Sequence, residues 1–227
     1  MRKRRIFWIV SLMLLLATAL SFMDRQVLSI SIIRIKDDLH ITDTEYGFIN
    51  SGFLISYAVM FTLGGMLIDK YGSRLGLAFS VGFWSLATAL HALSMNAFHF
   101  GLFRFLLGVG EGGCFPGAIK AVIEWVPKQK HAIANGIAIG GSAIGAVVAV
   151  PLCAFTLSYT NWRVLFLISG VLGLIWVLCW LRMTNKYVKE QNQIVNKVSH
   201  SLKMSDFVAL FRNRDALLFI LIRFLLD

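Results

Sequence analysis

Recurring apolar runs of about 20 residues constrain this 227-residue chain more than any other feature. Helices of about 20 residues, at about 1.5 Å rise per residue, cross the roughly 30 Å hydrocarbon core of a bilayer. The sequence contains six such runs and therefore predicts an all-α membrane protein with six transmembrane helices. The expected helices cover residues 6–33, 46–68, 76–95, 99–126, 132–157 and 164–183.

The composition agrees with a membrane-embedded chain. Apolar residues make up 57% and charged residues only 15%, against about 25% charged in an average soluble domain. This excludes a water-soluble enzyme, a secreted disulfide scaffold and a disordered chain. Cys114, Cys153 and Cys179 lie far apart in apolar surroundings. Neither a CxxC pair nor metal-ligand spacing is present, so we expect no disulfide and no metal site.

The distribution of basic residues predicts the topology. Fifteen of the 22 Lys and Arg residues lie in the N-terminal segment and the connections on its side, and only three lie in the other connections. The positive-inside rule therefore places the N-terminus in the cytoplasm. The net charge of +10 indicates orientation in a lipid bilayer and not a nucleic-acid partner.

The polar and apolar segments predict three parts of the chain. Residues 1–184 are expected to form the six-helix membrane domain, and residues 185–214 a cytoplasmic linker. Within the linker, the segment 205–211 is either a short amphipathic helix or an unstructured piece. Residues 215–227 are apolar but too short to span, so we interpret them as a truncated seventh transmembrane helix of a longer protein.

Four ionisable residues inside the predicted spans are the main candidates for function. Asp24 and Arg25 lie in the first helix, and Arg104 and Glu111 in the fourth. Each costs about 2.5–3.5 kcal/mol to insert, so such groups mark functional sites by default. A buried carboxylate can take up and release a proton, and an arginine can bind an anion in bidentate fashion. The alternative is two structural ion pairs, Asp24 with Arg25 and Arg104 with Glu111, the latter seven residues apart on one helix face.

Other residues in the spans indicate hydrogen bonding and packing. Tyr57 is the polar tip in an apolar run, either a substrate hydrogen-bond donor or a packed core residue. The spacings 136–140 and 141–145 each join two glycines and predict close helix contact. Pro116 is expected to kink the fourth helix.

The connection after the second span carries a recognisable motif. Gly65, Asp69, Lys70, Gly72 and Arg74 match the pattern G-x-x-x-D-[RK]-x-G-x-[RK]. This resembles the cytoplasmic signature of the major facilitator superfamily, between its second and third spans. In that family the loop latches the two halves of the transporter in the outward-open state, so the resemblance implies a conformational latch here.

Three further segments narrow the resemblance. F-M-D-R at 22–25 is similar to the aromatic-x-D-R element of the anion:cation symporter family. The run at 104–116 resembles that family's R-x-x-x-G-x-x-E-x-x-x-x-P, and E-W-V-P at 124–127 resembles the exit from the same helix. The likeness covers the whole chain and is strongest to bacterial hexuronate, glucarate and galactonate transporters.

The resemblance implies roles for individual residues. Asp24 and Glu111 match the proton-coupling carboxylates. Arg25 and Tyr57 match substrate-contacting positions, and Arg104 matches an arginine that acts on the glutamate and belongs to the same substrate site. Ser142 stands where sugar-acid members carry a polar substrate-contacting residue such as Gln. The absence of a G-P-x-x-G-G pattern in the fifth helix favours symport over antiport.

The resemblance implies the N-terminal half of such a protein: two inverted three-helix repeats, a linker and the truncated seventh helix. A missing C-terminal six-helix half would complete the substrate site. The implied function is proton-coupled symport of a small organic anion, of the sugar-acid type, across the inner membrane, without a cofactor other than protons. Two alternatives are a non-transporting receptor or assembly protein on the same fold and a membrane-embedded enzyme. The costly midplane charges argue against the first, and scattered histidines argue against the second.

Overall fold

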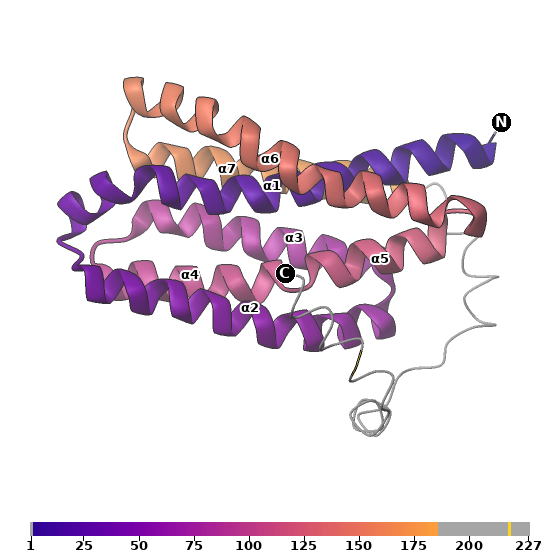
Figure 1. The fold of residues 1–227 in the computed structure, drawn as a ribbon, viewed down its shortest axis with the longest axis horizontal. Helices are drawn as coiled ribbons and strands as arrows, with labels where there is room; N and C mark the ends of the chain where they lie inside the picture. The colour runs from indigo at the N-terminus through magenta and orange to yellow at the C-terminus, as the bar shows by residue number, and fades with distance from the viewer. Residues whose placement is uncertain (1, 186–217, 219–227) are drawn as a thin grey trace.

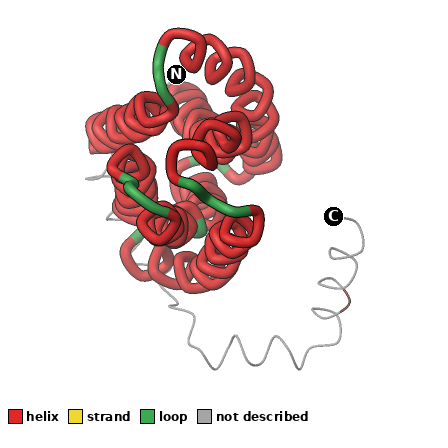
Figure 2. Tube along the Cα trace, turned by 90° about the vertical axis from the view of Figure 1, so that its left-hand side faces the viewer, coloured by secondary structure: helices red, strands yellow, loops and turns green. Residues whose placement is uncertain are grey.

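The computed structural model describes residues 2–185 and residue 218. Its long helices are α1 Arg2–Leu39, α2 Asp43–Tyr71, α3 Ser73–Leu90, α4 Ala97–Glu111, α5 Cys114–Trp125, α6 His131–Tyr159 and α7 Trp162–Asn185, with single 3₁₀ turns at His91–Leu93 and Lys128–Lys130. The helices run along the long axis of the molecule (Figure 1) and pack as a bundle in cross-section (Figure 2). Strands are absent from the described residues, and the all-α prediction is confirmed. The predicted linker and seventh helix lie almost entirely outside these residues.

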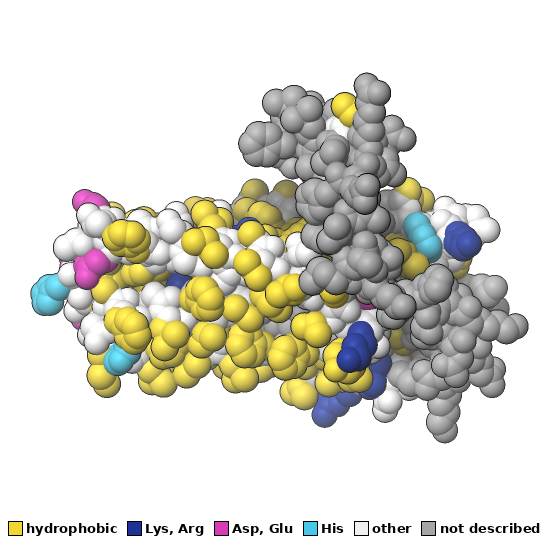
Figure 3. Space-filling model, turned by 90° about the horizontal axis from the view of Figure 1, so that it is seen from below, with side chains coloured by type: hydrophobic (Ala, Val, Ile, Leu, Met, Phe, Trp, Pro, Cys, Tyr) yellow, Lys and Arg dark blue, Asp and Glu magenta, His cyan; other side chains and the backbone are white. Residues whose placement is uncertain are grey.

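The helices provide six membrane spans, as the sequence predicts. Six segments are long and apolar enough to cross a bilayer: Arg5–Leu39, Asp43–Tyr71, Ser73–Leu93, Ala97–Trp125, Lys128–Tyr159 and Trp162–Asn185. Figure 3 shows hydrophobic side chains over the middle of one face, with acidic side chains at one end and Lys and Arg side chains near the other. An apolar belt between charged ends is what a lipid-embedded bundle requires.

The fourth span is broken into two helices. α4 ends at Glu111 and α5 begins at Cys114. Proline lacks an N–H and its ring clashes with the carbonyl four residues earlier, which for Pro116 is that of Gly112. The helix therefore breaks at Gly112 and Gly113, a larger effect than the expected kink. The break places Glu111 at a helix end, next to backbone groups that are not fully used inside the helix.

Local sequence signals set the two ends of α2. At its start, the Thr42 hydroxyl accepts from the backbone N–H of Glu45 at 3.2 Å, and the Glu45 carboxylate accepts from the backbone N–H of Thr42 at 2.8 Å. This reciprocal capping box satisfies donors that the first turn leaves open. At its end, Gly72 has φ of 80°, a conformation that L side chains rarely adopt. The glycine lets the chain turn directly into α3.

The helix pairing has the symmetry expected of two inverted repeats. The most extensive contacts join α1 with α6, α2 with α4, and α3 with α7. In two inverted repeats the first span (α1) corresponds to the fourth (α4 and α5), the second (α2) to the fifth (α6), and the third (α3) to the sixth (α7). Under this correspondence the α1–α6 pair is equivalent to the α2–α4 pair, and the α3–α7 pair is equivalent to itself. Two three-helix units that exchange neighbours in this way produce such a pattern.

Glycines bring α1 and α6 into direct backbone contact. A Cβ atom on Gly141 would lie 2.2 Å from the carbonyl oxygen of Leu15, and one on Gly145 only 2.1 Å from that of Ala19. The Thr18 hydroxyl donates to the Ala138 carbonyl across the same contact at 2.5 Å. The predicted close packing is therefore confirmed for the 141–145 pair. At the other pair, Gly136 and Gly140, an added Cβ would have no neighbour within 4 Å among the described residues, so these two glycines make no close helix contact there.

Candidate functional site

The central ion pair of the bundle joins Arg25 on α1 to Glu111 at the end of α4. The Arg25 Nε donates to Glu111 Oε2 at 3.0 Å, and Nη2 lies 2.9 Å from the same oxygen. The Glu111 side chain is fully buried, whereas 27% of the Arg25 side chain is exposed. The pairing runs between two helices. The alternative pairs considered from the sequence, Asp24 with Arg25 and Arg104 with Glu111, are absent from the described residues.

Aromatic rings surround the Arg25 guanidinium. Its central carbon lies 4.9 Å from the ring centre of Phe22, 5.4 Å from that of Phe53 and 4.7 Å from that of Tyr57. Cation–π contacts of this kind hold an arginine in place where little water is available. Tyr57, predicted as either a substrate donor or a core residue, thus lies against the charged cluster and stacks on Phe53 at 5.9 Å.

Arg104 lies in the same neighbourhood with unused hydrogen-bonding capacity. Its central carbon is 4.4 Å from the ring centre of Phe53, the ring that Arg25 also contacts. The side chain is buried, and its Nε and Nη1 have no hydrogen-bond partner among the described residues; Oε1 of Glu111 also lacks one. Buried polar atoms without partners are costly and need an explanation. The guanidinium groups of Arg25 and Arg104, which lie near the single carboxylate of Glu111, can together bind an anion.

Asp24 faces a different interface, although it is adjacent to Arg25 in sequence. Its buried carboxylate accepts hydrogen bonds from the Thr88 hydroxyl on α3 at 3.3 Å and from the Ser169 hydroxyl on α7. Successive residues of a helix point about 100° apart. α1 therefore directs the side chain of Asp24 toward α3 and α7, and that of Arg25 toward α4.

The structure does not bring Ser142 to this cluster. Ser142 lies on α6 and its hydroxyl donates to the Ile139 carbonyl of its own helix at 2.7 Å. The neighbouring Gly141 contacts Thr18 of α1, and Arg25 lies seven residues further along that helix, about 10 Å away. In this arrangement Ser142 and Arg25 occupy different levels of the bundle.

The predicted latch residues separate at the end of the bundle. Asp69 pairs with Lys120 of α5 at 2.8 Å. Arg74 turns toward α7, where its Nε donates to the Thr184 hydroxyl at 3.1 Å. Lys70 is exposed, with its ammonium 5.4 Å from the ring centre of Tyr71. Gly65 faces Pro116, where an added Cβ would lie 3.5 Å from the proline Cβ, and Gly72 makes the turn described above.

A second set of contacts ties this connection to α5. The carboxylate of Glu124 accepts from both the backbone N–H and the hydroxyl of Ser73, at 3.1 and 2.6 Å, and so caps the start of α3. Trp125 donates to the same hydroxyl at 2.9 Å. The motif loop is therefore held by partners within these six helices.

Sequence reasoning missed the residues that complete the two carboxylate sites. Thr88 and Ser169 hold Asp24, and their signal was available: small hydroxyl residues inside apolar runs, opposite a carboxylate that needs donors. Phe53 contacts both arginines, but a phenylalanine in a transmembrane run carries no sequence signal of that role. Contact between the helices alone identifies it.

Comparison with known proteins agrees with this architecture. The chain matches the Major Facilitator Superfamily over residues 14–226. It is 34% identical over 194 residues to a hexuronate transporter of Bacillus subtilis. The matched region covers 86% of this chain and 45% of that protein. It is 30% identical over 223 residues to a probable L-galactonate transporter of Escherichia coli, covering 94% and 49%. The chain thus spans about half the length of the curated relatives it matches.

Solved structures give the same result. A bacterial homolog of the human lysosomal transporter Spinster, in an inward-facing and unoccupied conformation, superposes with a TM-score of 0.68 at 25% identity, covering 77% of this chain and 42% of that one. The family match covers most of the chain, the relatives are named as transporters, and the helices form the six-span bundle. The chain therefore belongs to the Major Facilitator Superfamily, as a multi-pass membrane protein of a transporter family and not an enzyme.

Proposed function

We propose that this chain provides one half of a proton-coupled symporter that imports a small organic anion, a sugar acid of the hexuronate, glucarate or galactonate type. In this proposal residues 1–184 form the membrane domain of an inner-membrane protein with a cytoplasmic N-terminus. Residues 185–214 form a linker, and residues 215–227 begin a seventh span. A C-terminal six-helix half would complete the substrate site, because the matched relatives are about twice as long.

The buried Arg25–Glu111 pair beside Arg104 is the observation that carries the proposal. Glu111 and an anionic substrate compete for the same guanidinium. A proton on Glu111 removes its negative charge and releases Arg25 to bind the carboxylate of the substrate. Arg104 supplies a second guanidinium, whose Nε and Nη1 have no hydrogen-bond partner among the described residues. Proton uptake and anion binding are coupled through one residue.

Asp24 is proposed as the second proton carrier. Its carboxylate joins α1 to α3 and α7 through the hydroxyls of Thr88 and Ser169. Protonation at Asp24 alters that contact, whereas protonation at Glu111 alters the contact of α1 with α4. Protons are then the only coupling ion, and both carboxylates bias how α1 packs in the membrane.

The remaining candidates take supporting roles. Tyr57 lies against Arg25 and can donate its phenol to the substrate. Ser142, at a different level of the bundle, would meet the substrate only in a different state of the transport cycle. The loop with Gly65, Asp69, Lys70, Gly72 and Arg74 is proposed as the conformational latch, which the Asp69–Lys120 pair steadies.

The relatives support the substrate class. One is a hexuronate transporter of Bacillus subtilis, one a galacturonate transporter of Dickeya chrysanthemi and one a probable L-galactonate transporter of Escherichia coli. These compounds are sugar acids that carry a carboxylate. A carboxylate is the group that paired arginines recognise bidentately.

Transport in membrane vesicles tests the proposal in a whole transporter, in which this chain is joined to the C-terminal half that completes the substrate site. Labelled glucuronate, galactonate and glucarate are offered with and without an inward proton gradient, and uptake is normalised to folded protein. Wild type is expected to accumulate one of them only with the gradient. Glu111→Gln should lose accumulation but keep exchange of substrate across the membrane, because the amide cannot carry a proton.

The matched control is Asp37→Asn, which replaces an exposed carboxyl at the end of α1 by an amide. It should transport as wild type does. Proton-dependent accumulation that survives in Glu111→Gln would remove the coupling role of Glu111, and absence of transport of all three sugar acids by wild type would remove the proposed substrate class.

A further inference from the structure

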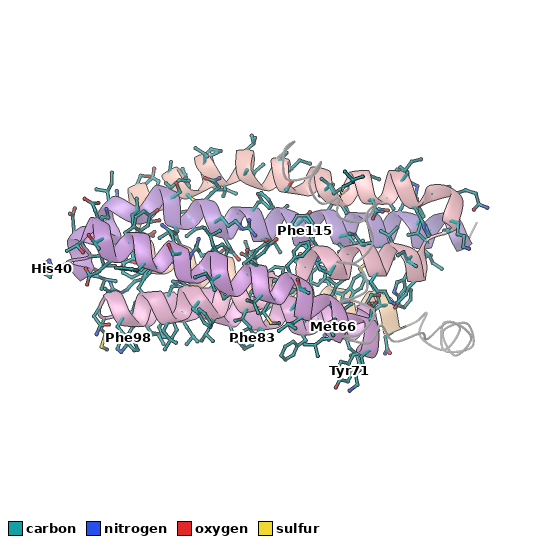
Figure 4. The ribbon with its side chains drawn as sticks, turned by 60° about the horizontal axis from the view of Figure 1, so that its bottom comes forward. His40, Met66, Tyr71, Phe83, Phe98 and Phe115 are labelled. Atoms are coloured by element: carbon teal, nitrogen blue, oxygen red, sulfur yellow. The ribbon has the colours of Figure 1, made fainter. Side chains whose placement is uncertain are left out.

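A cavity of about 450 Å³ opens between α2 and α3. Its walls are formed by apolar side chains of α2 and α3, among them Leu67, Leu75 and Phe79, and its floor by Val109 and Gly110 of α4. These three wall side chains are 47–71% exposed. In Figure 4, Tyr71 and Phe83, which also line the cavity, lie along the same edge of the bundle.

The helix pairing explains why the cavity exists. α2 packs mainly on α4, and α3 packs mainly on α7, so contact between α2 and α3 themselves is limited. Gly64 sits in the cavity wall, and a Cβ there would lie 3.1 Å from the Cα of Gly113. The glycine lets α2 approach the break between α4 and α5. α2 and α3 meet at Gly76, where a Cβ would lie 2.6 Å from Cγ1 of Ile68, and the cavity lies beside that contact.

The cavity spans one leaflet of a bilayer. On α2 its lining extends from Met60 to Tyr71, eleven helical steps of about 1.5 Å or about 16 Å of helix. This is half of the roughly 30 Å hydrocarbon thickness. One end lies near the middle of the spans, beside Val109 and Gly110, and the other lies at the turn into α3. A single acyl chain, entering from the leaflet at that end, has this length and polarity.

The exposed side chain of Lys70 lies next to one end of the cavity, beside the lining residue Tyr71. Lys70 is exposed and precedes Tyr71, whose ring lies 5.4 Å from its ammonium. The adjacent carboxylate, Asp69, is paired with Lys120 at 2.8 Å. Lys70 has no acidic partner among the described residues, so its charge is available to an anion at the membrane surface.

We propose that the α2–α3 cavity is a binding site for an anionic glycerophospholipid. One acyl chain fills the apolar cavity, and the phosphate lies on the Lys70 ammonium and the Tyr71 hydroxyl. The lining of the cavity includes none of the residues of the charged cluster, although Gly110 directly precedes Glu111. The site depends on the proposed function only through the orientation, which makes the occupied leaflet the cytoplasmic one, where anionic lipids attract basic residues.

Photo-crosslinking tests the site in the full chain. The protein is placed in bilayers that contain phosphatidylglycerol or phosphatidylcholine with the same photoreactive acyl chain, and labelled peptides are mapped by mass spectrometry. We expect phosphatidylglycerol to label the segments 60–71 and 75–83 preferentially. Lys70→Gln should lower that labelling about fivefold, the loss expected for one lysine at the membrane surface.

Two matched controls separate the headgroup from the chain. Lys128→Gln removes another exposed lysine at the same end of the bundle and should leave labelling unchanged. Leu67→Trp fills the cavity and should block labelling, whereas Leu178→Trp, at a similarly exposed position of α7, should not. Equal labelling by the two lipids, or equal effects of the paired variants, overturns the proposal. None of these readings depends on transport.

Discussion

Asp24 and Glu111 are both buried carboxylates in the middle of the bundle, but the two regions around them are built differently. Glu111 is held by the guanidinium of Arg25, and its second oxygen is left without a hydrogen-bond partner among the described residues. Asp24 is held by the hydroxyls of Thr88 and Ser169, with no ion-pair partner in the part of the chain that the structure describes.

This difference teaches how neighbouring residues of one helix can carry separate tasks. An ion pair in a water-poor interior depends strongly on both partners, because removal of one leaves an uncompensated charge. Neutral hydroxyl donors accommodate either a carboxylate or its protonated form. The Arg25–Glu111 region is therefore the more sensitive to loss of charge, and the Asp24 region the more sensitive to loss of a donor.

The largest expected effect separates the two carboxylates directly. Glu111→Gln leaves Arg25 and Arg104 without a compensating charge and should lower the free energy of unfolding by about 3 kcal/mol. Asp24→Asn keeps one oxygen that accepts from one hydroxyl, and its NH2 group can donate to the other hydroxyl, which turns to accept; the free energy of unfolding should change by less than about 1 kcal/mol. Thermal unfolding of both variants in the same detergent measures the contrast. Equal losses would show that the two regions are not distinct.

A double-mutant cycle sharpens the nature of the Glu111 region. Arg25→Gln and Glu111→Gln should each destabilise the protein, and the double variant should lose about 2 kcal/mol less than the sum of the two. The reason is that the double variant removes both charges of the pair, so that neither partner leaves the other buried and uncompensated. Chemical unfolding of the four proteins gives the coupling energy, and additive losses would contradict the pair.

The donors around Asp24 give a smaller effect. Ser169→Ala removes one of two hydrogen bonds to a buried carboxylate and should lower the free energy of unfolding by about 1–2 kcal/mol. Ser158→Ala is the matched control, since that exposed hydroxyl bonds only within its own helix. If both serine variants unfold alike, Asp24 does not depend on its hydroxyl donors.

The smallest effect concerns the ring shared by the two arginines. A cycle with Phe53→Leu and Arg104→Gln should give a coupling of about 0.5–1 kcal/mol, the range for a cation–π contact. The same cycle with the exposed Phe48→Leu in place of Phe53→Leu should give none. An equally large coupling with Phe48→Leu would mean that the coupling of Arg104 does not come from its contact with the Phe53 ring.

The sequence alone predicts much of the fold and only part of the site. Apolar length predicts all six spans, and Pro116 predicts the disturbance in the fourth. The cost of charge in the membrane selects Asp24, Arg25, Arg104 and Glu111 as candidate site residues, and the structure pairs Arg25 with Glu111. Their partnership itself was not predictable, because Arg104 shares a helix face with Glu111 and offers an equally reasonable pair. Ser142 shows the same limit, since its level in the bundle follows from how α6 packs on α1.

Hydrophobic length, basic residues at helix ends and the cost of burying charge act along the chain, so the sequence by itself determines the number of spans, their predicted orientation and the residues of interest. The partner of each charge depends on the rotation and approach of separate helices. Glycines at Gly141 and Gly145 set how closely α1 meets α6, and the break before Pro116 sets where α4 ends. Only the tertiary structure decides that α1 turns Asp24 toward hydroxyls and Arg25 toward Glu111, because hydrogen bonds and ion pairs form over about 3 Å between segments far apart in sequence.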